Sequence, residues 1–211
     1  GLRIQDSGNL SVIGDVIRHA NITRRDSDTG NWQLTVERGA NTNFTYVDMS
    51  YVNATWNASS TIAYSRITGA GSWTIYQGVV VRFIGTLFEQ IAGAVFKIFG
   101  TLILQGSAVF GHLNITSTGN LTMEVGANVT VLNDFYCANT TFLTNHTSVL
   151  GNLIADSGCT LTIAGAKTLT VNGNVTITSG AIINVTAGST VITSSTTQLN
   201  GTLSISSGTW V

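Results

Sequence analysis

Asparagine carries the clearest chemical signature in this chain, because thirteen of its eighteen copies begin an Asn-x-Ser or Asn-x-Thr triplet. Such triplets accept N-linked glycans, in which a sugar is joined to the Asn side-chain amide. With Ser and Thr at about a quarter of positions, chance would place roughly four or five of them. The excess predicts an exported protein with covalent N-glycans on its surface. The predicted sites are Asn9, Asn21, Asn43, Asn53, Asn57, Asn114, Asn120, Asn128, Asn139, Asn145, Asn174, Asn184 and Asn200.

The middle residue of these triplets is apolar in ten of the thirteen, as in Asn43-Phe44-Thr45 and Asn128-Val129-Thr130. In a strand, successive side chains point to opposite faces, so the apolar residue is buried while Asn and Ser/Thr point outward. The triplets therefore indicate strands as well as glycans. A Thr-rich β protein would produce some of them by alternation alone, and that alternative predicts the same strands.

Patterns for catalysis and metal binding are weak. The acidic residues are scattered, whereas polysaccharide hydrolysis and Ca²⁺ binding each need several carboxylates together. Only Asp26 and Asp28 are close in sequence, in a segment ending at Gly30 that is typical of a solvated turn. We therefore expect no enzyme activity.

The three histidines, at His19, His112 and His146, are far apart and have no Glu or Cys at metal-binding spacing, so we interpret them as surface or turn residues. No nucleophile elbow or phosphate-binding Gly-rich loop is present either. We expect no metal and no cofactor.

The surface implied by the composition is almost uncharged. Only 9% of the 211 residues are charged, the net charge is -1, and beyond residue 98 the charged residues are Glu124, Asp134, Asp156 and Lys167. This argues against nucleic-acid binding and predicts association unless glycans or partner subunits cover the surface. The seven arginines all lie at or before Arg82, mixed with acids, which suggests a solvated or inter-subunit face.

Two further features concern the environment. No membrane span is predicted, because the most apolar stretch, 79–104, is interrupted by Arg82, Glu89 and Lys97. The chain begins at Gly1 without a signal-like apolar run, from which we expect a mature, exported form.

Short apolar-alternating runs separated by Gly, Asn or Ser recur roughly every eight residues after about residue 98. Evenly spaced short strands can build a sandwich, a barrel or a solenoid. The absence of Pro and the scarcity of hairpin turns favour an all-β parallel β-solenoid with three strands per coil of roughly 22 to 24 residues, and a β-sandwich is the alternative. We expect one domain over 1–211, less regular and richer in aromatic residues and Arg over 1–97, and regular and rich in Thr, Ser and Asn over 98–211.

The repeats resemble the right-handed parallel β-helix of the pectin-lyase-like class, as found in extracellular surface proteins. The runs that carry the resemblance include His112–Thr116, Lys167–Val171 and Asn174–Thr178. The resemblance implies a fold and no particular activity. The segment 87–99 is compatible with a helix or with strands. Gly93 within the segment and Gly100 directly after it favour strands.

Cys137 and Cys159 lie 22 positions apart, which matches the expected coil and predicts a disulfide between neighbouring coils. Cys159 shares its alternation with the apolar Leu161 and Ile163, whereas Cys137 shares its alternation with Asn139. A turn must therefore follow Cys137.

Both ends of the chain carry strand-like apolar patterns, with Leu2 and Ile4 at one end and Leu203, Ile205 and Trp210 at the other. Because a solenoid without polar caps exposes unpaired strand edges, we expect each end to bind another copy, by stacking or by strand addition. The sequence thus predicts a structural, non-catalytic subunit of an extracellular homopolymeric filament at the cell surface, from a prokaryote with general N-glycosylation such as an archaeon.

Three alternatives remain open. A monomeric adhesin or surface-layer module would have the same fold and glycans but blunted ends. A polysaccharide-active enzyme would need converging acids. A carbohydrate-binding module would use exposed aromatic residues such as Trp32, Trp56 or Trp73.

Overall fold

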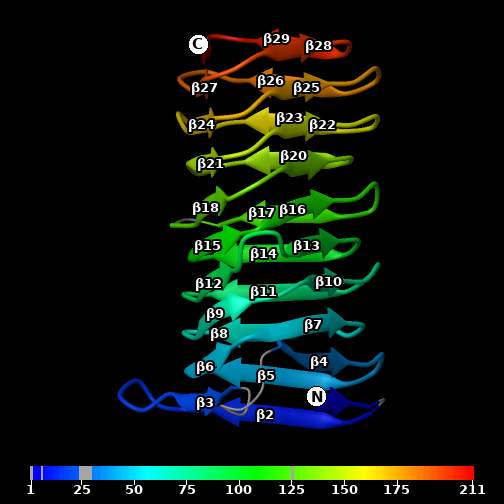
Figure 1. Cartoon of the computed structure of the whole chain (residues 1–211), viewed down its shortest axis with the longest axis vertical. Coiled ribbons are helices and arrows are strands. Elements are labelled where there is room, and N and C mark those ends of the chain that lie inside the picture. Colours follow the sequence, from blue (N-terminus) through cyan, green and yellow to red (C-terminus); the bar gives the residue numbers. More distant parts are fainter. Residues whose placement is uncertain (1, 6, 24–29, 125) are drawn as a thin grey trace.

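The computed structural model describes residues 2–5, 7–23, 30–124 and 126–211, and this part of the chain contains strands and turns but no helix. The strands form three sheets of ten strands each, stacked along one long axis (Figure 1). The acidic pair Asp26 and Asp28 lies outside the described residues.

Sheet A consists of β1 (Leu2–Ile4), β4 (Trp32–Val36), β7 (Val52–Trp56), β10 (Trp73–Ile75), β13 (Val95–Ile98), β16 (His112–Ile115), β19 (Phe135–Cys137), β22 (Leu153–Ala155), β25 (Val175–Ile177) and β28 (Thr197–Leu199). Sheet B consists of β2 (Asn9–Ile13), β5 (Asn41–Thr45), β8 (Ser60–Ala63), β11 (Val80–Ile84), β14 (Thr101–Gln105), β17 (Asn120–Met123), β20 (Thr140–Leu143), β23 (Thr160–Ile163), β26 (Ile182–Val185) and β29 (Thr202–Ile205). Sheet C consists of β3 (Ala20–Ile22), β6 (Val47–Ser50), β9 (Arg66–Ala70), β12 (Leu87–Gln90), β15 (Ser107–Phe110), β18 (Asn128–Val131), β21 (Thr147–Val149), β24 (Thr168–Val171), β27 (Thr190–Thr193) and β30 (Thr209–Trp210).

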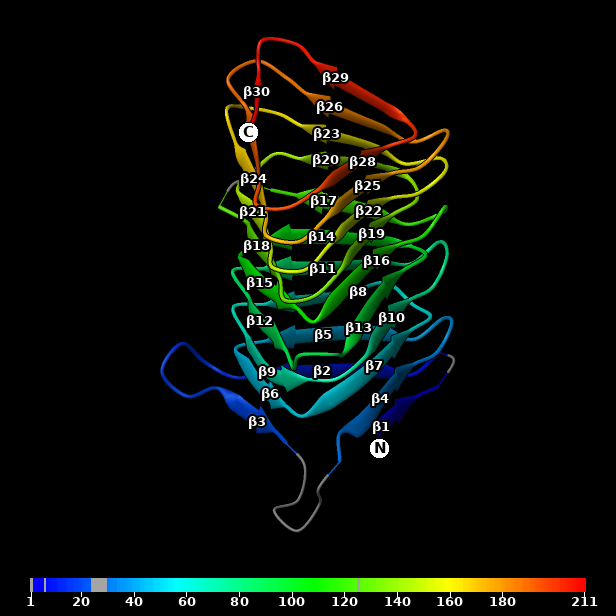
Figure 2. The same cartoon turned by 45° about the horizontal axis from the view of Figure 1, so that its top comes forward.

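Each strand from β1 to β27 pairs in parallel with the strand three places further along the chain, so each coil passes once through each sheet. Figure 2 looks obliquely into the coils and shows the three sheets as the walls of one stack. The predicted parallel β-solenoid with three strands per coil is therefore confirmed, and the β-sandwich alternative is wrong.

The coils are less uniform in length than the predicted 22 to 24 residues. Ala54 pairs with Trp73, 19 positions on, and Val95 pairs with His112, 17 positions on, whereas Val175 pairs with Thr197, 22 positions on. The corners cause this difference: one residue can join two strands in one coil, and four residues join the corresponding strands in another. Side-chain alternation reports strand length but not corner length.

The interior is filled by apolar side chains, because every second residue of a strand points inward. Its middle coils are aromatic, with Trp73 in contact with Phe83, Phe88 and Phe96 at centroid separations of 5.9, 5.1 and 5.8 Å. The later coils carry Leu, Ile and Val instead. Burial of these rings across neighbouring coils supplies a large share of the stabilising apolar contact.

Segment 87–99 forms two strands, β12 and β13, as expected. Phe88, Phe96 and Ile98 point into the core. Gln90 is also buried, because its side chain donates to the carbonyl oxygen of Gly71 at 2.6 Å and accepts the Gly111 amide at 3.2 Å. A polar residue is thus satisfied inside an apolar coil.

Sharp corners join sheets B and C. Tyr46 joins β5 to β6 with φ at 52°, and Tyr64 follows β8 with φ at 50°, a left-handed conformation that bulky residues rarely adopt. The two rings stack 5.4 Å apart on the outside of the corner. In the next coil Gly85 has the same conformation with φ at 55°, and the Tyr64 ring occupies the space that a side chain at Gly85 would need. Glycine therefore occupies this corner in the coil after Tyr64, because the Tyr64 ring leaves no room there for a side chain.

Candidate functional site

The sequon asparagines lie on the outside of all three sheets, and none of the thirteen is buried. Eight of the ten apolar middle residues are buried in the core, and Leu10 and Ile22, in the first coil, are half-buried. The strand interpretation of these triplets is therefore confirmed: the same alternation that directs the apolar residue inward presents the amide to solvent.

Eight sequon asparagines lie within strands, on sheets A, B and C alike, and five lie in turns between them. The strand group is Asn53 and Asn114 on sheet A, Asn9, Asn43, Asn120 and Asn184 on sheet B, and Asn21 and Asn128 on sheet C; the turn group is Asn57, Asn139, Asn145, Asn174 and Asn200. Glycans at these positions would surround the stack rather than cover one face.

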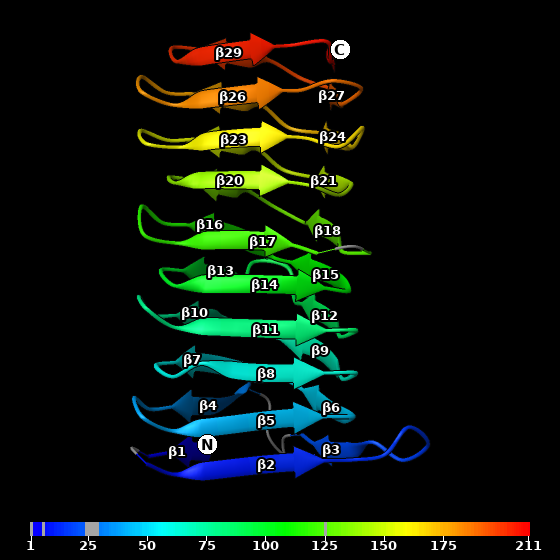
Figure 3. The ribbon, with the colours of Figure 1, turned by 180° about the vertical axis from the view of Figure 1, so that it is seen from behind.

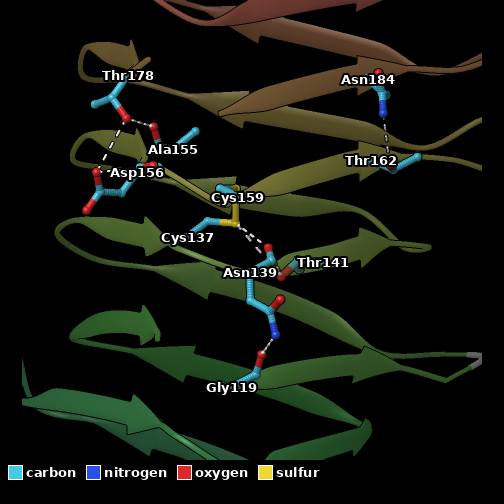
Figure 4. The surroundings of a disulfide bond; sticks show 11 residues. Gly119, Cys137, Asn139, Thr141, Ala155, Asp156, Cys159, Thr162, Thr178 and Asn184 are labelled. Carbon is cyan, nitrogen blue, oxygen red and sulfur yellow. Dashed lines mark hydrogen bonds between the residues drawn. A yellow bond between two sulfur atoms is a disulfide. The ribbon is translucent and has the colours of Figure 1, made fainter. Parts of the chain in front are cut away.

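In two sequons the Asn side chain donates to a backbone carbonyl oxygen and the Ser or Thr position is buried. The side-chain Nδ2 of Asn139 donates to the carbonyl oxygen of Gly119 at 2.7 Å, and that of Asn145 donates to the carbonyl oxygen of Glu124 at 2.8 Å, each on the preceding coil. Figure 4 shows Asn139 directed at Gly119. The Thr that completes each of these triplets, Thr141 or Thr147, is buried, whereas the Ser or Thr of the other eleven is not.

These two asparagines therefore act as links between coils. The sequence carries a signal for them: Asn139 and Asn145 are followed by Thr140 and His146 instead of an apolar residue. The corner shifts the alternation so that the residue two places after Asn faces inward.

Asn184 Nδ2 also donates, to the Thr162 hydroxyl at 3.5 Å, whereas Asn53 and Asn174 make their contacts through the side-chain carbonyl oxygen. Asn53 Oδ1 accepts the Ser72 amide at 2.9 Å, and Asn174 Oδ1 accepts the Ser195 hydroxyl at 2.7 Å. An N-glycosidic bond is made at Nδ2, so the contacts of Asn53 and Asn174 are compatible with a glycan.

Cys137 and Cys159 are joined by a disulfide between neighbouring coils, with their Cα atoms 5.5 Å apart (Figure 4). Cys137 ends β19, and the turn at 138–139 then changes the alternation before β20 begins. The turn required by the sequence pattern is thus present. Both cysteines are fully buried.

The histidines lie at the surface and connect neighbouring coils. Nδ1 of His19 lies 2.8 Å from Oδ1 of Asp48, Nδ1 of His112 lies 3.6 Å from Oδ2 of Asp134, and Nδ1 of His146 accepts the Thr168 amide at 3.3 Å. Each is a pairwise contact. Among the described residues, no group of three or more His, Cys, Asp or Glu side chains is arranged to hold a metal ion.

The described carboxylates have local roles. Asp15 accepts the backbone amides of Arg18 and Ile17 at 2.7 and 2.8 Å. These two bonds hold the pKa of Asp15 below its ordinary value of 3.8. Glu37 forms an ion pair with Arg3 on the neighbouring coil. These contacts stabilise turns and edges rather than form a paired acid and base.

Two of the three tryptophans considered for sugar binding lie in the core. Trp56 and Trp73 are fully buried, and the Trp32 ring nitrogen donates to the Ser50 carbonyl oxygen at 2.9 Å. The predicted stacking role in the core and between coils is correct for Trp56 and Trp73, whose rings lie 5.7 Å apart. Trp56 and Trp73 therefore present no ring face to an external sugar.

One concave surface lies where the short turn at 57–59 sits between the longer turns at 37–40 and 76–79. Its volume is about 1340 Å³, and its lining includes Arg38, Asn57, Tyr76 and Gln77. A sugar on Asn57 would emerge directly into this hollow.

The two ends of the stack are the remaining unusual surfaces. Leu199 pairs with buried Ile177 and Ile205 pairs with buried Val185, so both face inward by register. They are nevertheless 52% and 47% exposed, because no further coil lies over them in the described chain. At the opposite end Leu2 is 36% exposed although its partner, Leu34, is fully buried. Figure 3 shows β29 and β2 at the two opposite ends of the stack.

No helix in the described part of the chain is long and apolar enough to cross a membrane. Comparison with protein-family models, with curated proteins and with solved structures finds no significant match. The fold defines the chain as a parallel β-solenoid.

Proposed function

We propose that this protein is a structural, non-catalytic subunit of an extracellular, N-glycosylated filament at the cell surface, in which copies join through their ends. The observation that carries the proposal is the pair of open ends, where side chains that face the core by register, such as Leu199 and Ile205, are exposed. Contact between two different surfaces of one chain, without ring closure, produces an open fibre.

The glycan part of the proposal is supported by sequon geometry. In eleven sequons neither the Asn nor the Ser or Thr is buried. The charge content of 9% leaves a surface that a coat of glycans would keep solvated. The buried Cys137–Cys159 disulfide is consistent with an oxidising location outside the cell.

The same proposal includes the type of β-helix, the source of the protein and a role without catalysis. Three stacked parallel sheets with a continuous core support a place among the right-handed parallel β-helices of the pectin-lyase-like type. The density of sequons supports a prokaryotic source with general N-glycosylation, such as an archaeon. The pairwise, dispersed contacts of the described acids and histidines support a role without catalysis.

Electron microscopy of native material tests the proposal directly. We expect uniform fibres whose surface protrusions shrink after enzymatic or chemical deglycosylation. Discrete particles at every concentration would refute the filament and favour a monomeric adhesin or surface-layer module. Release of reducing sugars from a panel of polysaccharides would refute the non-catalytic role.

A further inference from the structure

We infer that the joint between subunits is one more coil-to-coil step of the solenoid, in which β28, β29 and β30 of one copy pair in parallel with β1, β2 and β3 of the next. This inference rests on the proposed filament and specifies its contact. The partner of each end is therefore a second copy of the same chain, in the same orientation.

Strand direction fixes the relative orientation of the copies. All pairs within the stack are parallel, and the two edges belong to opposite ends of the same three sheets. Only a head-to-tail arrangement presents edges that run in the same direction, so the hydrogen-bond pattern of the interior can continue across the joint. A head-to-head arrangement would require antiparallel pairing.

The C-terminal edge carries none of the features that usually block strand pairing. After Lys167 the sequence has no charged side chain and no Pro. Edge strands that are protected from association usually carry charges, Pro or bulges. The inward residues of this edge are Leu199, Leu203, Ile205 and Trp210, none of which is buried.

The N-terminal edge offers the matching surface. Its inward residues are Leu2 and Ile4 on β1, Leu10 and Val12 on β2, and Ala20 and Ile22 on β3, as their registers with buried residues of the next coil show. All except Ile4 are at least partly exposed. The two ends therefore present apolar side chains at the same strand positions.

Side-chain alternation limits the register on sheet B to shifts of two residues, and only one of these registers pairs both inward residues of each edge. The inward residues Leu203 and Ile205 align with Leu10 and Val12, which places the outward, exposed Ser204 beside Ser11 of the next copy. A shift by one residue would turn apolar residues outward. The same alignment on sheet A places Leu199 over Ile4.

Sheet C fits the same alignment. Trp210 pairs with the buried Val191 and faces inward, and Ala20 is the first inward residue of β3. The large indole would lie over the small alanine, so the joint accommodates the ring without crowding.

Stacking is favoured over exchange of a terminal strand. β1 pairs with β4 and β30 pairs with β27 within the same chain. Both terminal strands are thus already used in their own sheets, and neither is an extended donor. Exchange would first have to break these pairs, whereas stacking adds hydrogen bonds to edges that are already formed.

Cysteine cross-linking tests the register. In the chain produced without glycans, Ser11→Cys and Ser204→Cys in one molecule should give a ladder of covalent multimers after mild oxidation, because adjacent strands lie about 4.8 Å apart, within reach of a disulfide. The register control is Ser204→Cys with Ile13→Cys, which lies two positions further along the same exposed face of β2. This control should give little or no ladder.

The outcomes separate the joint from the filament itself. Fibres with an 11–204 ladder support the inference. Fibres without that ladder, or with a stronger 13–204 ladder, overturn the register and leave the filament in place. An absence of fibres for the unmodified chain overturns the filament proposal and the joint with it.

A second variant tests the joint through assembly. Trp210→Ala should raise the concentration at which fibres appear by about tenfold or more, since buried Trp side chains dominate many interfaces. The far-ultraviolet circular dichroism of the monomer should change little, because β30 contributes only Thr209 and Trp210. An unchanged fibre threshold would contradict a central role for Trp210.

Discussion

Asn139 allows the two roles of a sequon asparagine to be separated. Replacing Asn139 with Ala removes the 2.7 Å hydrogen bond to Gly119 and leaves that carbonyl oxygen without its side-chain donor. A neutral hydrogen bond in a partly buried position stabilises by about 1 kcal/mol, and an unsatisfied partner adds to the cost. We therefore expect Asn139→Ala to lower the free energy of unfolding by about 1 to 2 kcal/mol.

Urea unfolding of protein made without glycans provides the assay, followed by circular dichroism and read as a shift of the midpoint. Asn120→Ala is the matched control, because Asn120 is an exposed sequon residue whose side chain makes no hydrogen bond to another described residue. Its effect should stay within about 0.5 kcal/mol, as is usual for surface changes. Both variants remove one sequon. The difference between them therefore reports the hydrogen bond from Asn139 to Gly119 on the preceding coil.

Glycopeptide mass spectrometry of native protein provides the second readout. We expect Asn139 and Asn145 to carry no glycan, while Asn43, Asn120 and Asn128 are occupied. The reason is that Thr141 and Thr147 place the hydroxyl of the two unoccupied sequons inside the coil, at 0% and 3% exposure.

Two results would refute this reasoning. One is equal stability of Asn139→Ala and Asn120→Ala. The other is a glycan on Asn139 in protein that has the same fold and stability as the unglycosylated chain. An absence of glycans at all thirteen sequons would instead refute the proposed glycan coat and leave the stability prediction intact.

Four further predictions concern stability. Trp73→Ala should cost about 3 to 5 kcal/mol, as for large aromatic residues in other cores, measured by urea unfolding. Loss of the disulfide in Cys137→Ser, Cys159→Ser should cost about 3 kcal/mol by the chain-entropy estimate for a loop of this length, measured by thermal unfolding. Gly85→Ala should cost about 1 to 2 kcal/mol because of its left-handed backbone, and more if the Tyr64 ring cannot move. The lowered pKa of Asp15 should be visible by nuclear magnetic resonance titration, and its stabilising contribution should be complete above pH 3.8 and disappear as the pH falls through the lowered pKa.

Three of these predictions have a matched check. Trp73→Phe should recover much of the loss at that site, since the aromatic contacts with Phe88 and Phe96 are partly kept. Gly78→Ala has a positive φ but no atom within 4 Å of the added methyl group, so it isolates backbone strain from the Tyr64 contact. Asp15→Asn should remove this dependence of stability on pH at low pH. An unchanged pH dependence would assign it to another group.

Much of the fold could be predicted from sequence because alternation alone specifies which side chains face inward. Phe44 and Val129 are buried between outward neighbours as the triplets indicate. The strands in 87–99 also follow from glycine placement, although buried Gln90 has no sequence signal, since its partners Gly71 and Gly111 come from other coils.

The corners could not be predicted in the same way. Coil length depends on whether the corner between sheets B and C holds one residue, such as Tyr46, or four, as at 164–167. Corners also reset the alternation: Asn139 begins a glycan-acceptor triplet like the other twelve, but the turn after Cys137 directs its Nδ2 at the carbonyl oxygen of Gly119. Pairing across coils determines this contact, and the sequence marks it only indirectly, through the polar Thr140 that follows Asn139.

The open ends connect stability with assembly. In a solenoid each coil is stabilised by the coils on either side, so a terminal coil loses one of its two interfaces. The half-exposed Leu199 and Ile205 show this loss at one end, and Leu2 shows it at the other. A head-to-tail joint would turn both terminal coils into interior coils, so the weakest parts of the monomer would gain the most from assembly. Stability of the end coils should therefore depend on protein concentration, whereas stability of the aromatic middle should not.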